Sequence, residues 1–228
     1  MKKVIVAKNI HKVYNPKTIP VHALIGADLE IEEGEFTAIV GPSGSGKTTL
    51  LNIIGGLDRP SEGSVIIGGQ DIAELSDNQL INFRKDNIGF VFQAYNLIPV
   101  LTARENIEFV MLLQKKSKEE REARTTELLH AVGLEDKINN RPAQLSGGQQ
   151  QRVAVARALA SKPKFVLADE PTANLDSTSA AKLLDIMARL NKEENMTFVF
   201  STHDQRVIDR ARRVVTLVDG RVESDVTV

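Results

Sequence analysis

Residues 41–48 read Gly-Pro-Ser-Gly-Ser-Gly-Lys-Thr, and this stretch constrains the fold more than any other part of the chain. It follows an apolar run at residues 36–40 and precedes a helix-like run at residues 49–54. A strand, a glycine-rich turn and a helix are the setting of a phosphate-binding loop (P-loop), in which backbone N–H groups and the helix dipole face an anion. The alternative is a glycine turn with a chance lysine, which this setting disfavours. We expect nucleotide binding here.

The residues of the P-loop are expected to have different roles in binding a nucleotide. Its three glycines let the backbone curl, because glycine adopts conformations that side chains disfavour. Lys47 supplies a positive charge for the β- and γ-phosphates, and the Thr48 hydroxyl is placed to ligate Mg²⁺. The residues of this segment expected to bind the nucleotide are Gly41, Pro42, Ser43, Gly44, Ser45, Gly46, Lys47, Thr48 and Thr49.

The composition narrows the class of protein. The 228 residues carry a formal net charge of −1 and no long basic run, so we expect no nucleic-acid partner. The absence of cysteine excludes disulfides, thiolate metal sites and cysteine nucleophiles. No apolar stretch approaches the roughly 20 residues that cross a bilayer, and the first residues are typical of a strand rather than a signal peptide. We expect a soluble, cytoplasmic protein.

Short apolar runs alternate with amphipathic segments along most of the chain. Because strands that alternate with helices favour a parallel sheet, the pattern predicts an α/β fold with a largely parallel sheet. A helical lobe at residues 95–160 interrupts this alternation. Strands are expected at residues 3–8, 28–31, 36–40, 64–67, 88–92, 164–168, 197–201 and 214–218, and helices at 49–54, 102–132 with a break near Ser117, 178–194 and 204–211.

Two adjacent carboxylates, Asp169 and Glu170, end a buried-strand pattern at residues 165–168. Ligands gather at the carboxyl ends of strands in parallel sheets, and adjacent strand residues point to opposite sides. Asp169 is therefore expected to face Mg²⁺, directly or through water. Glu170 is expected to face the γ-phosphate and to polarise the attacking water. A solvated acidic turn before Pro171 is the alternative.

A second glycine-rich helix start follows Leu145. Ser146 is a good N-cap, and the two glycines after it expose the first amides of an alanine-rich helix, so this is a second anion-binding helix start. One nucleotide cannot easily need two such cradles on the same side. A capped structural helix is the alternative. The candidate residues, called here the signature segment, are Ser146, Gly147, Gly148 and Gln149.

Three motifs together resemble those of the ATP-binding-cassette (ABC) ATPases: the P-loop, Leu-Ser-Gly-Gly-Gln at 145–149, and Leu-Ala-Asp-Glu-Pro-Thr-Ala-Asn-Leu-Asp at 167–176. The resemblance covers essentially the whole chain. It implies that the chain binds ATP with Mg²⁺ and hydrolyses the ATP. It also implies a RecA-like P-loop NTPase core with a small antiparallel β lobe and a helical subdomain. The implied division is a core at 1–94 and 162–228 and a helical subdomain at 95–161.

The same resemblance implies a head-to-tail homodimer in which each ATP lies between one subunit's P-loop and the other's signature segment. ATP binding then closes the dimer and hydrolysis releases it. Gln93 matches the glutamine that touches Mg²⁺ and the lytic water, and His203 matches a histidine that donates to the γ-phosphate. Gln93 as a plain polar loop residue is the alternative. The residues that match the D-loop, which couples the two sites, are Asn174, Leu175 and Asp176.

Tyr14 matches the aromatic residue that stacks on adenine in this family. The glycine that usually follows is absent, because Asn-Pro-Lys occupies residues 15–17. The alternative is an aromatic residue in the core of the β lobe. The other histidines have no comparable context, and we expect them to be surface or packing residues: His11, His22 and His130.

Several stretches are similar to the lipoprotein-releasing and macrolide-export subfamily, at residues 41–52, 92–99 and 168–176. The chain matches only the nucleotide-binding half of a transporter. The resemblance therefore implies a separate membrane permease that docks at the groove near Gln93–Glu105, selects the substrate and holds the chain at the cytoplasmic face of the inner (plasma) membrane.

Non-transport ATPases share the signature segment and form the rival class. DNA-repair ATPases place a long coiled coil between the P-loop and the signature segment, whereas only 96 residues (49–144) without sustained heptads intervene here. A ribosome-acting factor would carry tandem cassettes, and a non-hydrolysing regulatory subunit is disfavoured because Glu170 and His203 are both present. The alternative function is a mechanical ATPase of the cell-division or DNA-repair type.

Overall fold

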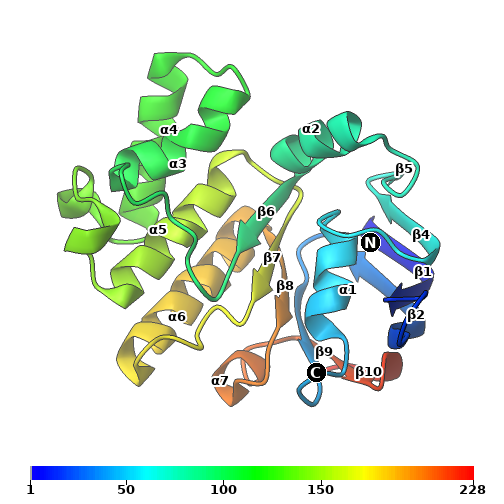
Figure 1. Cartoon of the computed structure of the whole chain (residues 1–228). Coiled ribbons are helices and arrows are strands. Elements are labelled where there is room, and N and C mark those ends of the chain that lie inside the picture. The colour runs from blue at the N-terminus through cyan, green and yellow to red at the C-terminus, as the bar shows by residue number, and fades with distance from the viewer. Residues whose placement is uncertain (1) are drawn as a thin grey trace.

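A six-stranded, mostly parallel sheet forms the centre of the computed structural model, which describes residues 2–228 (Figure 1). The strand order is β10-β9-β3-β8-β7-β6, and every neighbouring pair is parallel except the β9–β10 hairpin. The inner strands β7 and β8 are apolar and almost wholly buried, as in sheets covered on both faces. The strands are β3 (Phe36–Val40), β6 (Ile88–Val91), β7 (Phe165–Asp169), β8 (Thr197–Ser201), β9 (Arg213–Val218) and β10 (Arg221–Thr227).

A second, antiparallel sheet has the order β2-β1-β4-β5, formed by β1 (Lys3–Tyr14), β2 (Val21–Glu32), β4 (Glu62–Ile67) and β5 (Gln70–Asp71). The first two strands are much longer than the runs expected at 3–8 and 28–31. Pairing continues across register shifts, one of which follows Ala7. Asn9 lies within that shift with a φ of 49°. Such bulges let a strand continue where the apolar alternation fails.

The predicted helical stretch 102–132 and its break near Ser117 are confirmed. It comprises α3 (Ala103–Leu113) and α4 (Lys118–Ala131). Thr102 and Ser117 each cap a helix in a capping box, and this explains where both helices begin. The remaining helices are α1 (Lys47–Ile54), α2 (Asp77–Asn87), α5 (Gly147–Ala160), α6 (Ser177–Glu194) and α7 (Gln205–Ile208), with 3₁₀ turns at Glu135–Lys137 and Pro142–Gln144.

Two apolar clusters cover the two faces of the large sheet. Alternate strand residues supply them: Val166 belongs to the first cluster, and its neighbour Leu167 belongs to the second. The first cluster joins the sheet to α3, α4, α5 and α6, and the second joins it to α1 and the antiparallel sheet. Because α5 packs on both α3 and β6, one continuous core spans both proposed parts. The division into 1–94 with 162–228 and 95–161 stays a prediction. None of the helices within residues 2–228 is long and apolar enough to span a bilayer.

Candidate nucleotide site

Four neighbouring parallel strands end at one edge of the large sheet, and each is followed by predicted site residues. β3 leads into the P-loop, β8 into His203 and β6 into Gln93, while β7 ends in the carboxylates. These ends meet at one cavity of about 660 Å³, a size typical of small-molecule sites. The cavity is lined by Val21, His22, Ala23, Gly41, Pro42, Ser43, Gly44, Gly46, Lys47, Thr48, Thr49, Gln93, Glu170 and His203.

The P-loop requires glycine at positions 41 and 46. Gly41 has a φ of 148° and Gly46 a φ of 103°, in the region that side chains rarely adopt. A Cβ on Gly41 would lie 2.0 Å from the Leu217 carbonyl oxygen, and one on Gly46 would lie 2.4 Å from the Ala23 carbonyl oxygen. A Cβ on Gly44, by contrast, would meet nothing within 4 Å among residues 2–228. The loop is thus tightly backed by protein and open at its middle.

Lys47 is buried within the P-loop that it is expected to serve. Its Nζ donates to the carbonyl oxygens of Gly41 at 2.8 Å and Pro42 at 2.9 Å. An ammonium group has three donors, so one stays available for a phosphate oxygen. The hydroxyl of Ser45 is buried and has no hydrogen-bond partner within residues 2–228, but Ser45 is not among the residues that line the cavity. The remaining Lys47 proton fits an anionic group.

Oxygen atoms suited to Mg²⁺ meet where α1 begins. The hydroxyl of Thr48 lies 3.2 Å from each carboxylate oxygen of Asp169. Residues 2–228 hold no cluster of three or more histidine, cysteine or acidic side chains that could bind a metal by themselves. Mg²⁺ commonly takes one or two protein oxygens and completes its shell with water and phosphate. Thr48 and Asp169 therefore fit an ion that arrives with a nucleotide.

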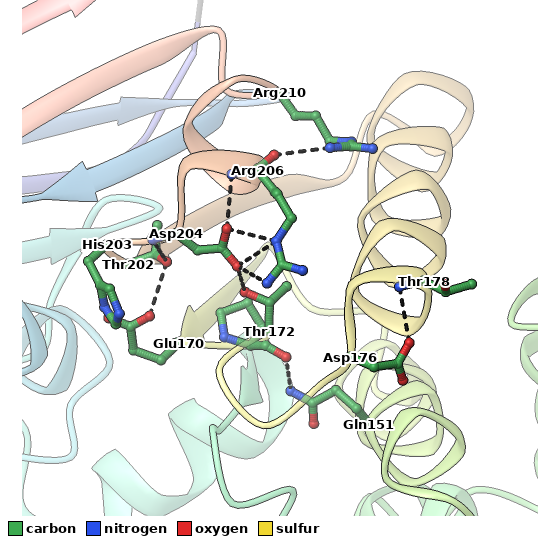
Figure 2. Close-up of polar contacts among 11 residues, drawn as sticks. Gln151, Glu170, Thr172, Asp176, Thr178, Thr202, His203, Asp204, Arg206 and Arg210 are labelled. Atoms are coloured by element: carbon green, nitrogen blue, oxygen red, sulfur yellow. Dashed lines mark hydrogen bonds and ion pairs between the residues drawn. The ribbon is translucent and has the colours of Figure 1, made fainter.

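Glu170 and His203, the two candidate catalytic residues, contact each other (Figure 2). The His203 Nδ1 lies 2.6 Å from Glu170 Oε1, and the Thr202 hydroxyl donates to Glu170 Oε2 at 3.1 Å. Glu170 has a φ of 44°, and its backbone N–H donates to the Ser201 carbonyl oxygen. The His203 side chain is 76 % exposed, whereas that of Glu170 is 16 % exposed. The carboxylate is thus oriented by β8 and its following turn, and the imidazole can swing toward a ligand.

The signature segment lies outside the P-loop cavity. Ser146 and Gln149 form a reciprocal cap: the Gln149 N–H donates to the Ser146 hydroxyl oxygen at 3.3 Å, and the Ser146 N–H donates to Gln149 Oε1 at 2.8 Å. None of the four residues 146–149 lines the cavity formed by the described part of the chain. The second anion-binding helix start therefore stands apart from the first.

The D-loop residues lie between the signature segment and Gln93. The Asn174 side-chain amide donates to the Gln93 carbonyl oxygen at 2.9 Å. Asp176 caps α6 by accepting N–H hydrogen bonds from Thr178 and Ser179, and the Ser179 hydroxyl holds the pKa of Asp176 below its usual range. Leu175 is half-buried and packs on the first apolar cluster.

Tyr14 does not line the cavity. Its hydroxyl donates to Asp58 at 2.9 Å, and the Lys12 Nζ lies 4.9 Å from its ring centroid. Burial and the Asp58 carboxylate raise the pKa of Tyr14. The cavity wall is formed instead by Val21–Ala23 of β2, which include His22, expected from the sequence to be a surface or packing residue. Adenine stacking by Tyr14 stays a prediction.

Comparison with known families and structures identifies proteins that are similar to this chain over most of its length. A family profile described as ABC transporter matches residues 24–173. The lipoprotein-releasing system ATP-binding protein LolD 1 of Rhodopseudomonas palustris is 48% identical over 97% of this chain and 99% of its own length. The macrolide export protein MacB of Hyphomonas neptunium is 45% identical over 96% of this chain, which spans 34% of that protein. The dimeric structure of the Methanocaldococcus jannaschii cassette MJ0796 bound to ADP and Pi has a TM-score of 0.90 and 47% identity, with 98% of each chain covered.

Proposed function

The chain belongs to the ABC transporter family as an ATP-binding subunit with ATPase activity, and from this premise we propose that two copies close head to tail around two ATP molecules. The observation that carries the proposal is the separation of the two anion-binding helix starts. The P-loop lines a cavity to which the signature segment contributes nothing within residues 2–228. A second copy would bring its signature segment to the open side of that cavity. The dimeric form of the similar MJ0796 cassette supports this arrangement.

The proposed chemistry assigns one task to each side chain at the strand ends. Lys47 donates its remaining ammonium proton to a phosphate oxygen and offsets the charge of the β- and γ-phosphates. Thr48, Asp169 and Gln93 would hold Mg²⁺, which offsets phosphate charge when bound. Glu170 accepts a hydrogen bond from the attacking water and orients it. His203 turns from Glu170 to donate to the γ-phosphate.

We further propose that the chain serves a permease of the lipoprotein-releasing or macrolide-export type at the cytoplasmic face of the membrane. The predicted docking region near Gln93–Glu105 borders an apolar groove of about 410 Å³ that includes Asn96. Exposed apolar side chains on that groove, Ile81 and Leu113 among them, support docking of an apolar helical segment of the permease. The permease would select the transported substance.

Replacing Glu170 by glutamine tests the proposal. The amide keeps the shape of the side chain but cannot act as a base, so ATP hydrolysis should fall about 10²–10⁴-fold while ATP is still bound. Sedimentation with ATP should show a stable dimer of the Glu170→Gln variant, and monomers without nucleotide. Glu193→Gln, at an exposed position near the end of α6, is the matched control and should behave as wild type. Turnover by Glu170→Gln at the native rate, or a stable dimer without nucleotide, would contradict the proposal.

A further inference from the structure

Gln151 is a fully buried polar side chain to which the proposed chemistry gives no task. It lies on α5, just after the signature segment, and none of its surface is exposed. Its Nε2 donates to two backbone carbonyl oxygens, that of Pro171 at 2.7 Å and that of Phe92 at 3.3 Å. Figure 2 shows the side chain reaching from its helix to the loop that carries Glu170 and Thr172.

The two carbonyl groups fix the orientation of this amide. Only the nitrogen can lie between two carbonyl oxygens, because an amide oxygen there would repel both. The Oε1 atom is left buried without a hydrogen-bond partner among residues 2–228. The Phe92 carbonyl also accepts the Tyr95 N–H, so it stays partly paired without Gln151. An apolar side chain of similar size removes the unpaired oxygen as well as the donor, but it also takes the Gln151 donor from the Pro171 carbonyl, so some loss of stability is expected.

Both carbonyl groups adjoin candidate catalytic residues. Phe92 precedes Gln93 in the chain, and Pro171 follows Glu170. Beyond Pro171, the Thr172 hydroxyl donates to Asp204 at 2.6 Å, and Asp204 follows His203. The amide nitrogen of Gln151 is thus linked, through hydrogen bonds and short stretches of backbone, to the neighbours of Gln93, Glu170 and His203.

Residues 92–96, here called the Gln93 segment, are also contacted at their other end by a second side chain of α5. Arg157 donates to the carbonyl oxygens of Tyr95, at 2.9 Å, and Asn96. Both of those residues have positive φ values, so this turn depends on being held. With Gln151 at Phe92 and Arg157 at the other end, the Gln93 segment is tied at both ends to the helix that begins at the signature segment.

We propose that Gln151 is a positioning residue that aligns Gln93 and Glu170 with α5, so that the rate of hydrolysis at a chain's own P-loop depends on where its signature segment is held. The inference rests on the proposed function, because it takes Gln93 and Glu170 as the groups that act on water. It adds a direction of coupling between the two sites. ATP held by the partner's P-loop contacts this chain's signature segment and moves its α5, and α5 in turn moves Gln93 and Glu170 at this chain's own P-loop.

The test compares Gln151→Met with Gln150→Met in the full chain. Gln150 is its neighbour on α5, but within residues 2–228 its amide donates only to the nearby Leu145 carbonyl, so it is the matched control. We expect kcat of Gln151→Met to fall at least tenfold against Gln150→Met, with KM for ATP unchanged and the thermal unfolding midpoint lowered by only a few degrees. In the Glu170→Gln background, Gln151→Met should still dimerise at the same ATP concentration.

A kcat within twofold of the control would overturn the proposal, and so would a loss of kcat matched by equal losses in ATP affinity, dimerisation and stability, because that pattern marks a purely structural residue. Gln151→Leu is the second variant, since its shorter side chain fits if the longer methionine side chain prevents folding. The same split between kcat and KM is required of it. Turnover by Glu170→Gln at the native rate would instead refute the proposed function, and the two failures are distinguishable.

Discussion

Gly148 of the signature segment packs directly against the first turn of α6, and its replacement by alanine tests how closely the two helices must approach. A Cβ on Gly148 would lie 2.8 Å from the Cβ of Ser179 and 2.7 Å from its hydroxyl oxygen. Ordinary contacts begin at 3.4 Å, so α5 and α6 would have to separate by about 0.6 Å. The short Ser179 side chain offers little room to swing away. We expect Gly148→Ala to displace the start of α5.

The expected magnitude combines two opposed effects. Overpacking of this kind costs about 1–3 kcal/mol. Alanine offsets up to about 1 kcal/mol of that, because it favours a helix more than glycine does. The net loss in the free energy of unfolding should be about 1–2 kcal/mol. The displaced segment should also weaken ATP-driven dimerisation by more than about tenfold, since the few contacts that dominate an interface each contribute about 2 kcal/mol or more.

A double-mutant cycle separates this clash from other causes. Ser179→Gly removes both atoms that the new methyl group would meet, so it should rescue Gly148→Ala in urea unfolding and in sedimentation of the Glu170→Gln background. Ser179→Ala keeps the Cβ and should rescue far less. The coupling energy between Gly148→Ala and Ser179→Gly should be at least about 1 kcal/mol. Additivity within about 0.5 kcal/mol would refute the steric argument.

Two further predictions concern stability. Asn106 is buried, accepts a hydrogen bond from the Ile98 N–H and donates to three backbone carbonyl groups. Asn106→Leu should therefore lower the free energy of unfolding, measured by urea titration, by about 2–4 kcal/mol. A loss below about 1 kcal/mol would contradict this. Hydrogen bonds from Arg206 hold the pKa of Asp204 well below its usual 3.8, so the stabilisation is present above pH 3.8 and is lost as the pH falls further. Urea unfolding from pH 6 to pH 2 should show a shallower pH dependence for Asp204→Asn, and equal slopes would disprove the linkage.

Local patterns predicted the features that local chemistry determines. The P-loop glycines have the positive φ values that the motif requires, and capping residues mark the starts of α3 and α4. The α/β class followed from strands that alternate with helices, and the two carboxylates at the end of β7 do have different partners. Asp169 contacts Thr48, and Glu170 contacts His203.

Features that depend on distant pairing were not predictable in the same way. The α2 helix has only Leu80 fully buried, so it shows no apolar stripe, although the capping box at Ser76 was a readable signal. The cavity wall at Val21–Ala23 exists because β2 pairs with β1 beside the P-loop, and no motif marks it. Gln151 and Thr202 act through contacts with other strand ends, which a linear pattern does not reveal.

The reciprocal cap at the start of α5 has a consequence for association. It uses the oxygen of each side chain as acceptor, which leaves the hydroxyl proton of Ser146 and the amide protons of Gln149 as donors. Both side chains are already locked in one rotamer by the helix that they cap. The loss of rotamer freedom is therefore incurred when the chain folds rather than when a partner arrives. The segment can meet an anion as a rigid template, and its contribution to closure is correspondingly less opposed by entropy.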